Sequence, residues 1–161
     1  MSETRAAAAL AETGIDHVIV RHGPVDSLVE AALARGVVPN QVVKTLVVRR
    51  GEDDYLFILV PGDRQISWPK LRALLGVTRL SMPSAETARD VTGYERGTIT
   101  PFGALRAWPV IADARVQGPI SIGAGAHGVS ALAAAADVIR SLSATVADVT
   151  APQAVDDARR Q

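Results

Sequence analysis

The feature that most constrains the fold is an apolar run at residues 42–48, which carries valine or leucine at both odd and even positions. Side chains alternate between the two faces of a strand, so this run predicts a strand that is covered on both sides. Residues 42–50 and 55–60 read as paired strands around a turn at residues 51–54. The sequence therefore predicts a hairpin, which places residue 44 in a sheet.

Lys44 lies inside this apolar run and is one of only two lysines among the 17 basic residues. An ammonium placed there must be desolvated or must reach a wet cleft. Lysine is a compact charge whose pKa shifts readily, which suits it to holding a phosphate or a carbonyl oxygen. The alternative is a lysine at a strand end whose head group extends into water. Both interpretations stay open at this point.

Composition limits the possible classes of protein. A chain of 161 residues that is 48% hydrophobic and 21% charged suits one globular domain. It has no cysteine, and its three histidines show no metal-ligand spacing, so we expect neither a thiolate site nor a metal. We expect no signal peptide and no membrane span, and hence a cytoplasmic protein. The net charge of zero argues against strong non-specific binding of nucleic acid.

The remaining pattern mixes helices and strands. Capping residues and apolar periodicity predict helices at residues 2–13, 27–35, 67–76, 84–91 and 132–142. Short apolar runs predict strands at residues 17–21, 77–81, 108–112, 120–122 and 145–149. The residues from Thr150 onward are polar, and we expect them to form a frayed tail. The predicted domain is thus residues 1–149, with a tail at residues 150–161.

Two glycine-rich segments are candidates for ligand binding, at residues 93–103 and 121–128. Glycine allows backbone N–H groups to approach an anionic or carbonyl oxygen closely. Each segment, taken singly, also fits a plain tight turn. The second contains the Gly123-x-Gly125-x-x-Gly128 pattern of dinucleotide-binding proteins, with Asp148 at about the distance of a ribose-binding acid. However, too few residues follow Gly128 for the strands that such a fold needs.

Taken together, these segments resemble one family, the YbaK and prolyl-tRNA synthetase-associated domains, which edit misacylated tRNA. The likeness runs from about Ile15 to Val149 and includes the motif His22-Gly23-Pro24, the Lys44 strand and both glycine loops. The resemblance implies an α+β fold, a single compact domain with a mixed, mostly antiparallel sheet curled into a barrel and surrounded by helices. It also implies a cleft beside the lysine.

The resemblance further implies a trans-editing hydrolase that deacylates mischarged aminoacyl-tRNA. The family lysine matches Lys44, the predicted catalytic residue, and no metal or organic cofactor is implied. The predicted substrate-binding residues lie next to Lys44 and in the two glycine loops; they are Thr45, Tyr94, Gly97, Thr98, Ile99, Thr100, Pro101, Phe102, Gly103, Gly123, Ala124, Gly125, His127 and Gly128. The family is not thought to need a catalytic triad, since water, a tRNA hydroxyl or the thiol of a mischarged cysteine can attack the ester. The expected partners are the aminoacylated 3′ end of a mischarged tRNA and an aminoacyl-tRNA synthetase that helps to deliver it.

Substrate choice stays open at the level of sequence. Thr45 after the lysine is similar to the cysteinyl-tRNA(Pro) deacylases, whereas the alanine-specific branch tends to place asparagine there. The Gly-Ala-Gly-Ala-His-Gly turn departs from the Gly-Gly turn of the cysteine branch. His127 either contacts substrate or is an ordinary surface histidine. A non-catalytic aminoacyl-tRNA-binding module with the same fold is the alternative function, and a dinucleotide-binding protein is a further one.

Overall fold

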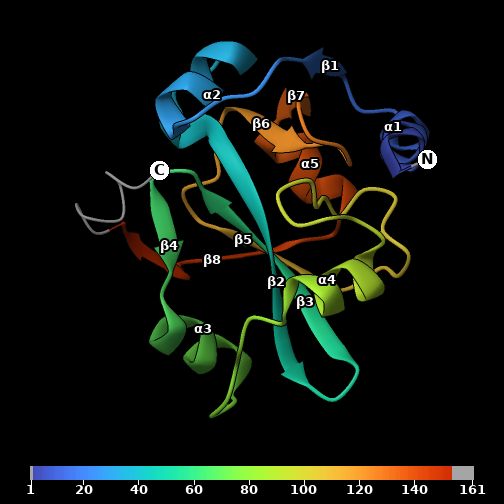
Figure 1. Ribbon diagram of the computed structural model, residues 1–161. Coiled ribbons are helices and arrows are strands. Elements are labelled where there is room, and N and C mark those ends of the chain that lie inside the picture. The colour runs from blue at the N-terminus through green and yellow to red at the C-terminus, as the bar shows by residue number, and fades with distance from the viewer. Residues whose placement is uncertain (1, 154–161) are drawn as a thin grey trace.

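The central hairpin consists of β2 (Val42–Gly51) and β3 (Asp54–Pro61), which pair antiparallel. The computed structural model describes residues 2–153 of the chain and places this hairpin in the middle of the molecule (Figure 1). In β3 every residue after Asp54 is buried. The predicted hairpin is therefore confirmed; β2 begins where predicted, and the other three strand ends differ from the prediction by one residue.

Seven strands form one mixed sheet in the order β1-β7-β6-β2-β3-β5-β8. The strands that join the hairpin are β1 (His17–Arg21), β5 (Val110–Asp113), β6 (Pro119–Gly123), β7 (Val129–Ala134) and β8 (Thr145–Ala147). The β2–β6, β3–β5 and β5–β8 pairs are parallel, and the other three pairs of this sheet are antiparallel. The sheet is mixed, as expected, but antiparallel pairs outnumber parallel ones only when the separate pair of β4 (Arg64–Ile66) and β9 (Thr150–Pro152) is counted. A closed barrel would need the two end strands, β1 and β8, to pair with each other, and no such pairing is seen among residues 2–153. Closure into a barrel therefore stays a prediction.

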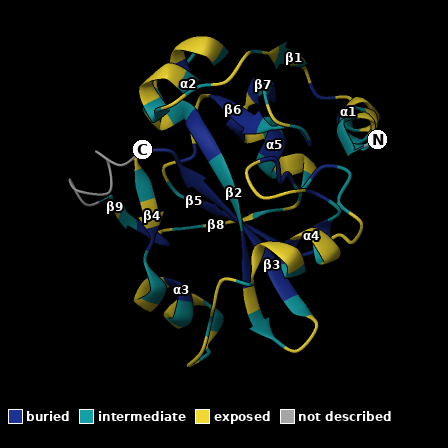
Figure 2. Ribbon diagram, viewed as in Figure 1, coloured by how far each residue is buried: buried dark blue, intermediate teal, exposed yellow. Residues whose placement is uncertain are grey.

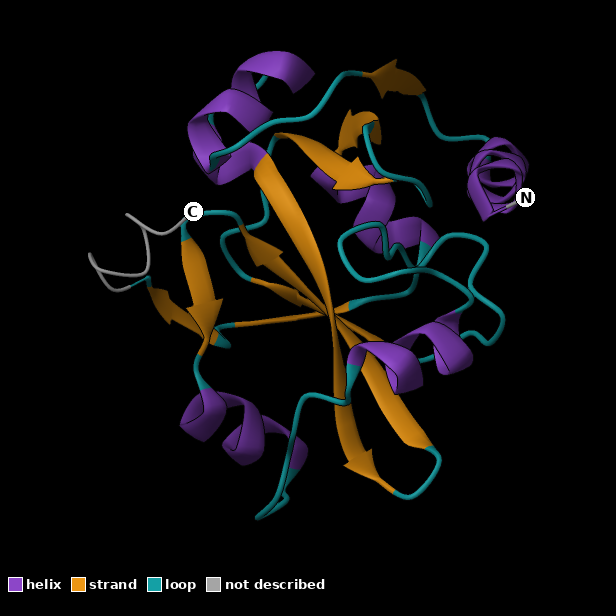
Figure 3. Ribbon diagram, viewed as in Figure 1, coloured by secondary structure: helices purple, strands orange, loops and turns teal. Residues whose placement is uncertain are grey.

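Helices cover the sheet on more than one side, as Figure 3 shows. They are α1 (Ser2–Thr13), α2 (Leu28–Arg35), α3 (Trp68–Leu75), α4 (Ala85–Thr92) and α5 (Ala135–Ser141), with a short 3-10 turn at Pro39–Gln41. Val43 and Val47 belong to one buried cluster, which includes residues of α1, α4 and α5, whereas Val48 belongs to a second cluster with Leu71 of α3. Both faces of the central strands are thus buried (Figure 2), as the apolar run predicted.

The caps of α2 are the ones that the sequence predicts. The Ser27 hydroxyl accepts a hydrogen bond from the Glu30 backbone N–H at 3.1 Å, and the Glu30 carboxylate accepts one from the Asp26 N–H at 2.7 Å. Gly36 ends the helix with a φ of 77°, a conformation that favours glycine. The helix stop therefore fixes Arg35 as the last residue of α2, which matters for the site.

Two predicted elements are corrected by the structure. The predicted strand at residues 77–81 is wrong, because only Ser81 pairs, in an isolated bridge with Arg49. The predicted helix at residues 132–142 begins instead at Ala135, because the preceding residues extend β7. Alanine-rich sequence at residues 131–136 fits either state, and pairing of β7 with both β1 and β6 favours the strand.

The chain beyond Val149 also differs from the expectation. β9 (Thr150–Pro152) pairs antiparallel with β4 (Arg64–Ile66) in a small second sheet that the sequence did not predict. The folded structure thus extends past the predicted start of the tail, and residues 154–161 lie outside the described residues. On α3, Leu71 is fully buried, whereas Leu74 is 44% exposed.

Candidate active site

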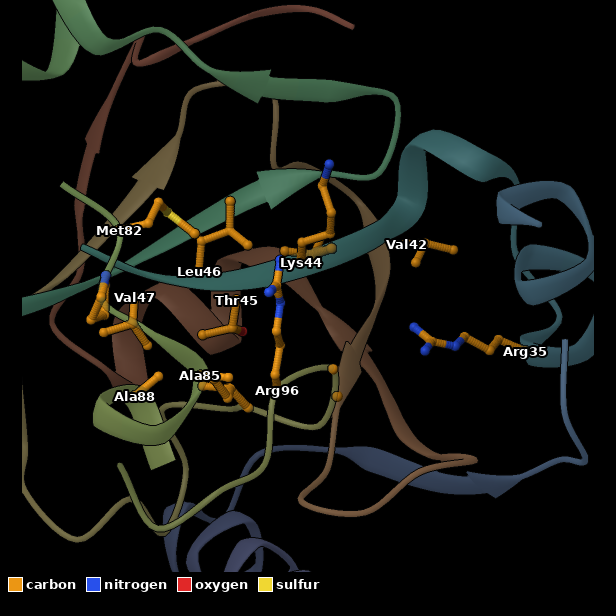
Figure 4. Close-up of a pocket in the computed structure, with 15 residues that line it drawn as sticks. Arg35, Val42, Lys44, Thr45, Leu46, Val47, Met82, Ala85, Ala88 and Arg96 are labelled. Atoms are coloured by element: carbon orange, nitrogen blue, oxygen red, sulfur yellow. The ribbon is translucent and has the colours of Figure 1, made fainter. Parts of the chain in front are cut away.

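A cavity of about 410 Å³ opens beside β2, and five of the predicted site residues line it. These residues are Lys44, Thr45, Gly97, Ile99 and Gly123. The rest of the lining comes from α2, β2, α4 and the segments that flank them: Arg35, Val42, Val43, Leu46, Val47, Met82, Pro83, Ala85, Ala88 and Arg96 (Figure 4). The structure therefore brings together the lysine strand and parts of both glycine loops.

Two contacts explain why these separate motifs meet. Parallel pairing of β2 with β6 places Val43 opposite Ile122, so that Gly123 lies beside the start of β2. The Gly125 N–H donates to the Thr98 carbonyl at 3.1 Å and ties the second glycine loop to the first. At Gly123 an added Cβ would lie only 3.2 Å from the Ile99 carbonyl oxygen. The close approach of the two loops therefore favours glycine at this position, since any larger residue would push the loops slightly apart.

Lys44 is half-buried, and its ammonium donates a hydrogen bond to the Arg64 carbonyl at 2.7 Å. Burial lowers the pKa of the Lys44 ammonium, and the nearby Asp63 charge partly opposes that shift. In Figure 4 the Lys44 and Leu46 side chains extend to one side of β2, whereas Thr45 and Val47 extend to the other side, toward α4. The ammonium thus has a protein partner, and that partner is a carbonyl rather than a carboxylate.

Thr45 is the predicted substrate-binding residue with an unused polar atom. Its hydroxyl oxygen is buried and finds no hydrogen-bond partner among residues 2–153. A buried hydroxyl without a partner is costly, which favours a ligand that supplies one. Since Thr45 points toward Ala85 and Ala88 in Figure 4, that ligand would lie in the cavity.

Arg35 and Arg96 also line the cavity, and the sequence did not single them out as site residues. Arg96 is exposed, in the first glycine loop. Arg35 is half-buried at the end of α2, and burial lowers the pKa of its guanidinium. With Lys44 these arginines give three cations, and no acidic residue among those described lines the cavity. The position of Arg35 just before the Gly36 helix stop could have marked it as a residue held in a fixed place.

A second cavity of about 430 Å³ adjoins the first and shares Arg35 and Gly97 with it. Its other lining residues are His22, Gly23, Pro24, Val25, Ala126, His127, Gly128 and Val129. The predicted residues His127 and Gly128 lie here rather than beside Lys44. The His127 side chain is 72% exposed and lies 3.7 Å from the Glu95 carboxylate.

Several predicted substrate-binding residues of the two glycine loops line neither of these two cavities. Tyr94 and Phe102 are buried in the core, where the Tyr94 hydroxyl donates to the Phe102 carbonyl at 2.5 Å. The remaining predicted residues outside the two cavities are Thr98, Thr100, Pro101, Gly103, Ala124 and Gly125. Thr98 and Thr100 are buried and bond to backbone groups of their own loop. A direct substrate contact for this group stays a prediction.

The dinucleotide interpretation is contradicted by the structure. The glycine pattern connects the antiparallel strands β6 and β7, whereas a dinucleotide fingerprint opens a helix. Asp148 is engaged elsewhere, because its carboxylate pairs with Lys70 at 3.0 Å and with Arg115 at 2.8 Å. Among residues 2–153 no group of three or more His, Cys, Asp or Glu side chains is placed to hold a metal ion. No helix in the same range is long and apolar enough to cross a membrane.

The family model of the aminoacyl-tRNA editing domain matches residues 22–140, and the chain belongs to that family. The YbaK-like resemblance read from the sequence is thereby confirmed.

Similar sequences occur within prolyl-tRNA ligases. The chain is 36% identical over 91 residues to the proline–tRNA ligase of Heliobacterium modesticaldum, a match that covers 56% of this chain and 16% of the ligase. It is 41% identical over 74 residues to the enzyme of Thermosipho africanus, covering 46% of this chain and 13% of the ligase. The chain therefore corresponds to a small part of each of these enzymes.

Solved structures share the whole fold. A proposed trans-editing enzyme for prolyl tRNA synthetase superposes with a TM-score of 0.83 at 26% identity, covering 93% of this chain and 97% of that chain. The hypothetical protein APE2540 gives a TM-score of 0.82 at 21% identity, covering 91% of this chain and 99% of that chain, a likeness of fold alone.

Proposed function

We propose that this chain is an aminoacyl-tRNA deacylase, a carboxylic ester hydrolase that removes a small mischarged amino acid such as cysteine from tRNA(Pro). The observation that carries the proposal is the first cavity. Apolar side chains and the glycine backbone form its walls, and Arg35, Lys44 and Arg96 supply positive charge without a lining carboxylate. A ligand that joins an uncharged, small side chain to a polyanion matches this arrangement.

In the proposed reaction the aminoacyl group enters between β2 and α4. Ala85 and Ala88 leave room for a small side chain, and the unpartnered Thr45 hydroxyl bonds the amino group or an ester oxygen. The attacking oxygen or sulfur forms a bond to the ester carbonyl carbon, and the bond to the ribose oxygen breaks. The proton lost by the nucleophile ends on that ribose oxygen. An activated ester needs chiefly orientation and stabilisation of the developing oxyanion.

Lys44 is the proposed source of that stabilisation. Its ammonium extends to the side of β2 opposite Thr45 and is bonded to the Arg64 carbonyl, so it must leave this neutral acceptor and turn toward the first cavity to reach a substrate oxygen. An oxygen that gains negative charge in the transition state is a stronger acceptor than a carbonyl, which favours the exchange at the moment of reaction. Desolvation at this half-buried position strengthens the interaction.

The finer assignments belong to the same proposal. Cysteine is the favoured amino acid because Thr45 follows Lys44, as in the family members that act on cysteinyl-tRNA(Pro). The domain works in the cytoplasm on the 3′ end of tRNA with help from a synthetase, and its sheet closes toward a barrel. Since the chain corresponds to 13–16% of the ligases above, delivery by a separate synthetase chain and fusion to one are both compatible with this proposal.

The rival function is a binding module that has lost turnover, and one experiment separates the two. A non-hydrolysable analogue, 3′-amino-3′-deoxyadenosine acylated with cysteine through an amide, is titrated into the isotopically labelled protein. Shifts in the amide resonances of Thr45, Gly97 and Gly123 are expected. Such shifts together with cleavage of Cys-tRNA(Pro) support the deacylase, whereas the same shifts without cleavage support the module. Shifts confined to residues outside the cavity would contradict both.

A further inference from the structure

Arg35 combines burial with the lack of a counterion: it is half-buried, and no carboxylate of residues 2–153 lies within ion-pair distance of it. Five other arginines pair with acidic side chains, namely Arg21, Arg50, Arg106, Arg115 and Arg140. In contrast, Arg35 makes one long hydrogen bond, from Nη1 to the Ser121 hydroxyl at 3.4 Å. Its Nε atom is buried and has no partner among residues 2–153.

This single contact does not make up for the hydration that the guanidinium loses on burial. Arginine keeps its proton in proteins, so burial cannot be relieved by neutralising the side chain. A buried cation without a partner is strongly unfavourable, and an anion that binds beside it recovers much of the loss. The geometry of α2, whose cap at Gly36 fixes Arg35, thus holds a charge in place without a protein counterion.

The location of Arg35 indicates what the anion belongs to. Arg35 and Gly97 are the residues shared by the two cavities, and Figure 4 shows the Arg35 side chain extending from α2 toward the cavity. A ligand that spans both cavities therefore passes the guanidinium. In an aminoacyl-tRNA the carboxyl group is consumed in the ester, so the only anions near the amino acid are phosphates.

The second cavity carries a further unused polar group. His22 Nδ1 lies 2.8 Å from the Gly23 carbonyl, which can only accept, so the proton is on Nδ1. His22 Nε2 is buried without a partner and, in the neutral ring, accepts a hydrogen bond. A ribose hydroxyl would satisfy it. This cavity thus offers a cation and an acceptor, the two partners that a nucleotide backbone needs.

We propose that the second cavity binds the phosphate of the terminal nucleotide through Arg35, while the first cavity takes the amino acid. The assignment rests on the proposed function for the identity of the ligand, but phosphate recognition can be measured without any catalysis. Arg35 is a positioning residue here: it places the 3′ end so that the ester lies between the cavities.

The binding test compares 5′-AMP with adenosine, which differ by the phosphate, using amide resonances of the full chain. The wild-type protein is expected to bind 5′-AMP about 10-fold to 100-fold more tightly, the range of a hydrogen bond to a charged group. Arg35→Gln should reduce this preference to about 2-fold, and Arg35→Lys, which keeps charge but loses the bidentate fork, should lie between. Arg79→Gln is the matched control, since Arg79 is exposed and lines neither cavity.

The catalytic test uses cysteinyl-adenosine and the cysteinylated trinucleotide CCA. Arg35→Gln should lower kcat/KM about 10-fold or more for the trinucleotide and less than about 3-fold for the nucleoside, by the same reasoning. If neither compound is cleaved but the 5′-AMP preference depends on Arg35, the proposed function fails and the phosphate site stands.

Three results would overturn the phosphate site. They are an unchanged 5′-AMP preference in folded Arg35→Gln, an equal loss in Arg79→Gln, and binding of inorganic phosphate as tight as that of 5′-AMP, which would indicate a site for a free anion. Melting temperatures of all variants, measured beside the titrations, show that each is folded. Arg35→Lys supplies the comparison if Arg35→Gln does not fold.

Discussion

Replacing Lys44 with methionine separates its catalytic role from its structural one. Methionine keeps most of the apolar stem and removes the ammonium, so packing along β2 changes little. The lost hydrogen bond to the Arg64 carbonyl is one to a charged donor, a class worth about 1.5–3 kcal/mol. Relief of the ammonium's desolvation offsets part of that loss, because burial already lowers the Lys44 pKa. We expect a net loss of unfolding free energy of about 1 kcal/mol or less, which corresponds to a fall in Tm of roughly 2–4 °C.

The effect of Lys44→Met on activity should be much larger. Loss of one donor to a developing oxyanion typically costs about 10²–10³-fold in rate. Lys44→Arg should fail as well, because the planar fork is wider than an ammonium. Single-turnover deacylation of Cys-tRNA(Pro) and thermal unfolding are measured side by side. Lys70→Met is the control: that lysine pairs with Asp148, outside the cavity, and should leave the rate unchanged. Full activity of the folded Lys44→Met variant would refute the assignment of Lys44.

The other predictions concern nucleotides, salt and acid. Neither NAD nor NADP should raise the Tm, because a ligand stabilises only a state that it binds, and clear stabilisation by either would revive the dinucleotide interpretation. The affinity for tRNA should fall only shallowly with salt, since each phosphate contact of a single strand contributes a slope of about −0.7 and the net charge is zero; a salt series that shows about six contacts or more would contradict this. Hydrogen bonds from Arg115 and then Lys70 lower the pKa of Asp148 to about 2, so its contribution to stability is present above its ordinary pKa and is lost as the pH falls through about 2. Urea unfolding should therefore show Asp148→Asn less stable than the wild type at pH 7 and equal to it below pH 2, and an equal difference at both pH values would exclude this mechanism.

Much of the fold could be read from local patterns. The central hairpin was predictable because its apolar runs and turn are local in sequence, and α2 because its caps are. The strand β7 was not, since alanine-rich residues show no clear preference and only pairing with β1 and β6 decides their state. The small sheet of β4 and β9 joins segments 86 residues apart, as in the hydrogen bond from Arg64 to Thr150, and three-residue strands carry little periodicity.

The site was predictable where it is built from motifs and not where it is built from tertiary contacts. The Lys44 strand, Gly97 and Gly123 were found because lysine in an apolar strand and glycine in a loop are locally unusual. Arg35 was missed because its special property is the missing counterion, which no sequence window displays. Conversely, Tyr94 and Phe102 lie in a conspicuous loop, yet the fold uses both of them in the core.

Single-turnover hydrolysis of tRNA(Pro) charged with cysteine, alanine or proline tests the central claim most directly. The full chain at excess concentration is mixed with each labelled aminoacyl-tRNA, and release of the amino acid is followed against spontaneous hydrolysis. We predict rapid release of cysteine and slower release of alanine. Proline, the cognate amino acid, should be released no faster than by spontaneous hydrolysis. Release of all three at the spontaneous rate, by protein that is folded and binds the non-hydrolysable analogue in the cavity, would contradict the claim that this site is a deacylase.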